Sequence, residues 1–191
     1  MRFLIDLALA VVIAIAVGIC SAWYAVDRGR LFGAVTAGGW TAWPREGGAD
    51  ADPYTLAMFA RTGEVPLGAG EGLSFTADHD ADGAPLSGKC TYDVVGETPA
   101  ARLWTLTATD NFGRLMDNVA HRPGFHSREI VRASDGSFLI TVSPTVESGN
   151  WLPIGTVDRF RLVLRLYDTP LTTGSQIASL VMPAIRKAAC P

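Results

Sequence analysis

The acidic stretch at residues 78–83 (DHDADG) contains the residue types that bind a calcium ion. Carboxylates at its first, third and fifth positions and a glycine at its sixth match the start of a calcium-binding loop. Such a loop also needs a bidentate glutamate at its twelfth position, where this sequence has Lys89. Because a lysine ammonium repels a cation, we expect a hairpin turn here and no metal site.

The three histidines are the other side chains that could bind a metal ion. His121 and His126 are five positions apart across a Pro-Gly pair, and His79 is remote from both in the sequence. A metal site would require the fold to bring them together, and we expect ordinary loop histidines instead. The sequence has no Gly-x-Ser-x-Gly nucleophile elbow and no cysteine with a plausible catalytic partner. We therefore predict no catalytic residue, no metal and no cofactor.

Aromatic and arginine side chains suggest a different chemistry, the binding of a small ligand. Arg161 and Arg165 lie on one predicted strand with ~13 Å between their Cα atoms, too far to hold one small carboxylate together. Arg165 and Tyr167 form a more compact pair, a cation beside a phenol. A cleft lined by Trp104, Trp151, Arg165 and Tyr167 would bind or hydrolyse a carbohydrate or an anionic molecule. The alternative is a solvated strand face with a cross-strand ion pair.

Cys90 and Cys190 are the two cysteines outside the apolar N-terminal segment. A disulfide between them would close a loop of about 100 residues and stabilise the fold by about 4–5 kcal/mol in the chain-entropy model. It would also hold down a chain end that otherwise frays. Disulfides persist in the periplasm and not in the cytosol, so the disulfide and a periplasmic location are linked predictions. The alternative is two unrelated buried thiols.

Residues 7–26 (LALAVVIAIAVGICSAWYAV) form a run of twenty residues without a charge. As a helix this run would be ~30 Å long, about the thickness of the hydrocarbon core of a bilayer. Trp23 and Tyr24 near its end suit the interfacial aromatic belt. We expect an uncleaved single-pass transmembrane helix. A cleaved signal peptide is the alternative, but the run is long and the small-residue site around Cys20 is a poor cleavage site.

The overall composition excludes several classes of protein. The 191 residues are 48% apolar and 18% charged, which is too apolar for a disordered chain. The formal net charge of −3 supplies no basic field for nucleic acid. Lysine and arginine counts on the two sides of the apolar run are nearly balanced and slightly favour a cytoplasmic C-terminal side, but long domains translocate largely regardless of such charge. We expect a bacterial inner-membrane protein with a periplasmic soluble domain, and this location depends on the disulfide.

Three segments follow from the changes of pattern along the chain. We expect residues 1–26 to be the anchor, residues 27–48 to be a linker rich in glycine and small residues, and residues 49–191 to be the folded domain. Residues 52–61 (DPYTLAMFAR) open the domain with its one predicted helix.

The ends of that helix are marked by capping residues. Asp52 is the expected N-cap, Pro53 fits the first turn, and Gly63 supplies a left-handed stop. Tyr54, Ala57 and Met58 fall on one helical face, which we expect to pack against a larger apolar surface.

After the helix, apolar residues recur with a period of two, which is typical of strands. The predicted strands are at residues 73–78, 90–95, 103–108, 128–133, 137–144 and 160–167. In the last of them Phe160, Leu162, Leu164 and Leu166 are expected to face the core, with Arg161, Val163, Arg165 and Tyr167 on the opposite face. About seven short strands and one short packed helix predict a mainly β protein, a jelly-roll-like β-sandwich.

Several segments resemble an uncharacterised bacterial family, domain of unknown function 1214. Its members show a tyrosine, a glycine and a proline before a Trp-(Ser/Thr)-Leu-Thr run, then a glycine and an asparagine, an Asn-Trp-Leu-Pro corner and a strand ending in Arg-Leu-Tyr. The matching positions here are Tyr92, Gly96, Pro99, Trp104–Thr107, Gly113, Asn118, Asn150–Pro153 and Phe160–Tyr167. The resemblance covers roughly residues 40–190, departs from the family at Asp168 and Thr169, and implies a jelly-roll-like sandwich.

In longer relatives this domain follows another one, domain of unknown function 1254, in the same chain. Here the apolar run stands before the domain instead. The resemblance therefore implies a non-catalytic binding or assembly module, tethered to the bilayer through residues 7–26, that pairs with a separately encoded companion of that type. No catalytic residue is established for the family, and the resemblance assigns none.

Overall fold

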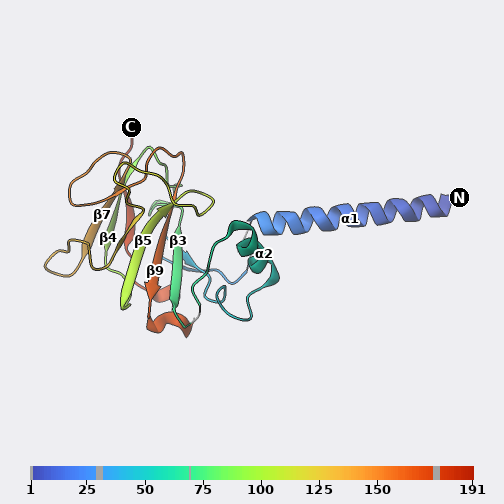
Figure 1. Ribbon diagram of the computed structural model, residues 1–191, viewed down its shortest axis with the longest axis horizontal. Coiled ribbons are helices and arrows are strands. Elements are labelled where there is room, and N and C mark those ends of the chain that lie inside the picture. Colours follow the sequence, from blue (N-terminus) through green and yellow to red (C-terminus); the bar gives the residue numbers. More distant parts are fainter. Residues whose placement is uncertain (1, 29–31, 69, 174–176) are drawn as a thin grey trace.

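The chain forms a long N-terminal helix and a two-layered β domain (Figure 1). The computed structural model describes residues 2–28, 32–68, 70–173 and 177–191. One sheet has six strands in the order β1-β2-β3-β9-β5-β6, and the other has four in the order β10-β4-β7-β8. The prediction of a mainly β fold behind an apolar helix is confirmed, and the two sheets are compatible with a jelly-roll-like sandwich.

The elements have the following bounds. The six-stranded sheet contains β1 (Val35–Ala37), β2 (Trp40–Ala42), β3 (Gly72–Ala77), β5 (Leu103–Thr109), β6 (Gly124–His126) and β9 (Arg161–Tyr167). The four-stranded sheet contains β4 (Thr91–Gly96), β7 (Phe138–Ser143), β8 (Asn150–Pro153) and β10 (Ala184–Ala189). The helices are α1 (Arg2–Arg28) and α2 (Pro53–Thr62), with 3-10 turns η1 (Pro170–Thr173) and η2 (Ile177–Ser179).

The core lies between the two sheets, and β9 supplies its central row. Phe160, just before β9, and Leu162, Leu164 and Leu166 within it are each at most 1% exposed. The strand pairs antiparallel with β3 on one side and with β5 on the other, so these side chains are enclosed laterally as well. The opposite face of β9 is half-buried, as its alternation predicts.

Part of the segment predicted as a linker belongs to the sheet. β1 and β2 pair through Ala37 and Trp40, with Gly38 between them at a φ of 57°. β2 in turn pairs with β3. Trp40 is 1% exposed and donates its indole N–H to the carbonyl of Pro183, so burial of this ring fixes the segment on the sheet. Residues 29–31 of the expected linker lie outside the described residues.

Two other local predictions need correction. Residues 128–133 do not form a strand, because only Arg132 makes a bridge, to Phe138, across the hairpin turn. In addition, β6, β8 and β10 were not predicted as strands. Each lies at the edge of its sheet, and β6 and β8 have only three and four residues.

Helix α2 begins and ends at the predicted capping residues. The Asp52 carboxylate accepts from the amides of Tyr54 and Thr55, and Gly63 closes the helix at a φ of 73°. The buried face, however, consists of Thr55, Met58 and Phe59, whereas Tyr54 is 42% exposed.

Helix α1 projects away from the sandwich as a single rod, with α2 at its base (Figure 1). Its segment at residues 2–27 is long enough and apolar enough to cross a membrane, a test that a signal sequence also passes. At the base, the guanidinium of Arg61 in α2 lies 3.1 Å from the Asp27 carboxylate and 4.5 Å from the ring centroid of Trp23. The two helices are therefore joined by an ion pair and a cation–π contact.

Truncation of the central strand tests this architecture. We expect Leu164→Ala to lower the free energy of unfolding by about 2–5 kcal/mol, because it opens a cavity between the sheets. Val163→Ala, one position along on the half-buried outer face, should cost clearly less. Denaturant unfolding of both variants in the full-length detergent-solubilised chain measures the difference, and equal losses would contradict the assignment of the two faces.

Candidate functional site

The four residues expected to line a ligand cleft lie on three different surfaces. Trp104 is 3% exposed inside the core, where its ring lies 5.1 Å from that of Phe138. Trp151 is in register with Thr141 on the outer face of the four-stranded sheet, since their neighbours Leu152 and Val142 point into the core.

Arg165 and Tyr167 lie on the outer face of the other sheet. Their cross-strand partners on β5 are Thr105 and Leu103. The full thickness of the sandwich separates this pair from Trp151. The expected cleft is therefore not formed. It was predicted wrongly because residue spacing in the sequence does not reveal which sheet a strand joins.

The histidines do not converge on a metal site. His79, just after β3, contacts the Asp78 carboxylate at 2.7 Å, and His126, on the edge strand β6, contacts Glu129 at 3.3 Å. His121 lies in a loop at a φ of 49°. In the described part of the chain, no group of three or more His, Cys, Asp or Glu side chains could hold a metal ion.

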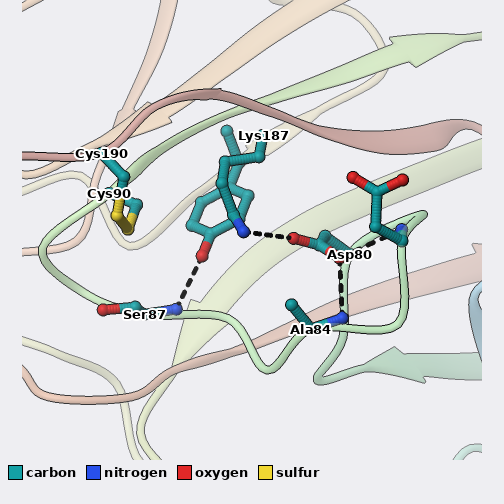
Figure 2. A network of polar contacts seen from close by, with 8 residues as sticks. Asp80, Ala84, Ser87, Cys90, Lys187 and Cys190 are labelled. Carbon is teal, nitrogen blue, oxygen red and sulfur yellow. Dashed lines mark hydrogen bonds and ion pairs between the residues drawn. A yellow bond between two sulfur atoms is a disulfide. The ribbon is translucent and has the colours of Figure 1, made fainter.

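The DHDADG segment forms a tight turn around Asp80, in agreement with the hairpin prediction. The Asp80 Oδ1 accepts from the amides of Asp82 and Ala84, at 3.1 and 2.9 Å (Figure 2). Its Oδ2 lies 3.3 Å from the Nζ of Lys187 on β10, and the aspartate side chain is fully buried. Burial raises the pKa of Asp80, but the Ala84 amide, Lys187 and the Asp82 amide together lower it below its usual value.

This turn and a disulfide hold β10 from two sides. The Sγ atoms of Cys90 and Cys190 are bonded, with 4.2 Å between the Cα atoms (Figure 2). Ala81 donates its amide to the carbonyl of Ile185, which adds a backbone contact between the turn and the strand. The ion pair of Asp80 with Lys187 thus fastens β10. Sequence reasoning missed this pair, whose only signal in the sequence was the Asp-x-Asp-Gly turn.

Asn150, the first residue of the Asn-Trp-Leu-Pro corner, acts as a clamp. Its side-chain amide exchanges two hydrogen bonds of 2.8 Å with the backbone of Val131 and donates a third to the carbonyl of Leu139. Trp151 donates its indole N–H to the carbonyl of Ser143 at 3.1 Å. These bonds hold β8 parallel to β7, although only residues 144–149 connect the two strands.

The clamp borders a shallow apolar groove on the outer face of the four-stranded sheet. Val95 and Leu139 form a cross-strand pair there, and Val131 lines the side. Leu139 is 49% exposed and Val131 is 72% exposed. The labelled strands β4 and β7 lie on the side of the sandwich farther from α1 (Figure 1), so this groove faces away from the base of the helix.

A larger cavity, of about 540 Å³, lies at the opposite side, between α2, the end of α1 and the six-stranded sheet. Its charged lining residues are Asp27, Arg61, Glu64, Asp78 and Arg161. Trp43, Met58 and Phe112 supply apolar surface. Sequence reasoning did not find this cavity, because its walls come from six separate segments of the chain.

The fold defines a two-sheet β domain that follows an apolar helix. The sequence matches, over residues 71–171, the family described as protein of unknown function (DUF1214). The match covers more than half of the chain, and the chain belongs to this family. No curated protein matches the sequence.

A solved structure supports the fold assignment. The VPA0106 protein from Vibrio parahaemolyticus matches with a TM-score of 0.58 and 23% identity, over 73% of this chain and 36% of that protein. An uncharacterised protein from Burkholderia cenocepacia matches with a TM-score of 0.42 and 19% identity, over 65% of this chain and 31% of that one. This chain thus spans little more than a third of the length of the Vibrio protein.

The Asp80 turn predicts a specific acid dependence of stability. The pKa of Asp80 in the folded state lies below its usual value of 3.8. Its contribution is therefore fully present above that pH, and it is lost as the pH falls through the folded-state pKa. We expect Asp80→Asn to lower the melting temperature at pH 7 and to flatten its fall between pH 4 and pH 2, as measured by thermal unfolding at each pH.

The exposed Asp82, in the same turn, provides the matched control. Asp82→Asn removes one carboxylate of the turn without affecting the contact with Lys187, and its acid profile should follow that of the unmodified protein. A parallel shift in both variants would show that the contact with Lys187 does not stabilise the fold.

Proposed function

We propose that this protein is a membrane-tethered module of the bacterial cell envelope that acts by binding a separate companion domain. The observation that carries the proposal is the apolar groove on the sheet face turned away from α1. Exposed apolar surface of this kind, next to polar residues, marks protein–protein contact sites.

The length comparison supports a companion. The domain aligns with only 36% of the Vibrio parahaemolyticus protein, so the fold in that protein is accompanied by a larger additional part. We infer that a separately encoded partner, of the type of domain of unknown function 1254, supplies the equivalent part here and covers Val95, Val131 and Leu139.

The use of the polar side chains favours binding over catalysis. Asp80 holds a turn and a lysine, Asn150 clamps two backbone segments, and Asp110 is bonded to the Arg114 side chain and to two backbone amides. Each of these groups is engaged in holding the fold.

The location proposed for the domain is the periplasmic side of the inner membrane. Helix α1 would be the single-pass anchor, and the disulfide between Cys90 and Cys190 would form and persist in the periplasm.

Thiol labelling in intact bacterial cells tests this location. In a Cys20→Ser background only Cys90 and Cys190 remain. We expect neither thiol to react with maleimide after denaturation unless a reductant is added first, and both to react afterwards. Labelling without reductant would place the domain in a reducing compartment.

Photo-crosslinking tests the companion. A photoreactive residue at Leu139 should capture one defined protein in cells, and Leu139→Glu should abolish its co-purification because it buries a charge in the interface. Thr107→Glu, on the outer face of the other sheet, should leave co-purification intact. A solubilised chain that remains monomeric and crosslinks to no protein at Leu139 would refute the companion proposal.

A further inference from the structure

The cavity at the base of α1 combines an apolar lining with charges of both signs. Its volume of about 540 Å³ lies within the usual range of about 300–1,000 Å³ for small-molecule sites. Val26 and Asp27, at the end of α1, form part of its wall. The outer face of β3 and β9 forms the floor through Thr76 and Arg161.

Arg161 is the cation in this lining that is left without a partner. Its side chain is half-buried, and across the described ranges no ion pair or hydrogen bond joins its guanidinium to a neighbour. The other arginine, Arg61, is held by Asp27 and Trp23. A partly desolvated guanidinium binds phosphate well, because its planar fork matches two phosphate oxygens.

The remaining charges select among phosphate-bearing ligands. The described residues of the lining include two arginines and three carboxylates, and one of these carboxylates, Asp27, is paired with Arg61. The Asp78 carboxylate lies in the same lining as Arg161 and would repel a ligand with a net negative charge. A zwitterion is favoured instead, with its phosphate on Arg161 and its ammonium group towards Asp78.

The apolar lining and the position of the cavity indicate where such a zwitterion would come from. Trp43, Met58 and Phe112 offer a surface for hydrocarbon next to the charges. Trp23 and Tyr24 lie within one turn of Val26, at the end of α1 where an interfacial aromatic belt is expected. With α1 in a bilayer, the cavity would lie at the depth of the lipid headgroups.

We propose that this cavity binds the headgroup of a zwitterionic aminophospholipid of the phosphatidylethanolamine type, with Arg161 as the phosphate ligand. The inference rests on the proposed membrane tether and adds to it a specific lipid site. Such a lipid would fill the space between α2 and the sheet and stabilise the junction between the anchor and the domain.

Native mass spectrometry of the full-length chain tests the proposal. The chain is released from nanodiscs that contain equal amounts of phosphatidylethanolamine and phosphatidylglycerol. We expect one phosphatidylethanolamine to be retained in preference to phosphatidylglycerol. Arg161→Gln should reduce its retention about tenfold or more, the effect of losing one charge-assisted hydrogen bond pair.

Arg165→Gln is the matched control, since Arg165 lies on the same strand and the same face but does not line the cavity. It should retain the lipid as the unmodified chain does. Equal retention by the Arg161 and Arg165 variants, or an excess of phosphatidylglycerol, would overturn the inference. A second variant, Phe112→Ala, removes an exposed ring and should also weaken retention without affecting the core.

Two further arms separate the possible outcomes. Soluble phosphoethanolamine added to the nanodiscs should not displace the lipid, and displacement at low concentration would point to a free phosphate ester as the ligand.

Alkaline carbonate extraction of cell membranes tests the tether itself. A chain that stays in the membrane but retains no lipid contradicts only the lipid site, whereas a chain that is extracted contradicts the tether as well.

Discussion

The alternation of side chains along β9 is the constraint on which the rest of the structure depends. This strand is hydrogen-bonded on both edges, so its register fixes the positions of β3 and β5 at once. A shift by one residue would bring two arginines into the core and expose three leucines, which makes any other register very costly. The same alternation places Arg161 on the floor of the cavity beside α2. The packing of the core and the position of Arg161, the proposed phosphate ligand, therefore follow from the same alternation.

The second layer is held by polar contacts rather than by a long strand. Its edge strands β8 and β10 are fastened by the Asn150 side chain, by the ion pair of Asp80 with Lys187 and by the disulfide. Edge strands with few core residues gain little from burial, so side-chain hydrogen bonds and a covalent link supply what the hydrophobic effect does not. This arrangement leaves the outer face of β4 and β7 open, and Leu139 on that face is 49% exposed.

Sequence reasoning found the elements whose physics is local and missed those that depend on tertiary contacts. The strands with sustained alternation, the capped helix and the two-faced strand at residues 160–167 were predicted because period and capping are properties of neighbouring residues. β10 was missed because Ile185 is its only fully buried side chain, so it shows no alternation. The prediction of a ligand cleft was wrong because the fold places Trp104 and Trp151 in opposite sheets. The cavity beside α1 could not be predicted from the sequence, since it exists only where six separate segments meet.

The contact between Arg61 and the last turn of α1 has a mechanical consequence. A flexible linker would let the domain take any orientation relative to the membrane. Contacts with α2 instead fix the direction of α1 relative to the domain. With α1 in a bilayer, its contact with α2 would set the height and tilt of the sandwich above the lipid surface. A second protein anchored in the same membrane then searches for it in two dimensions and at a fixed height, which raises the effective concentration of one for the other without any additional contact.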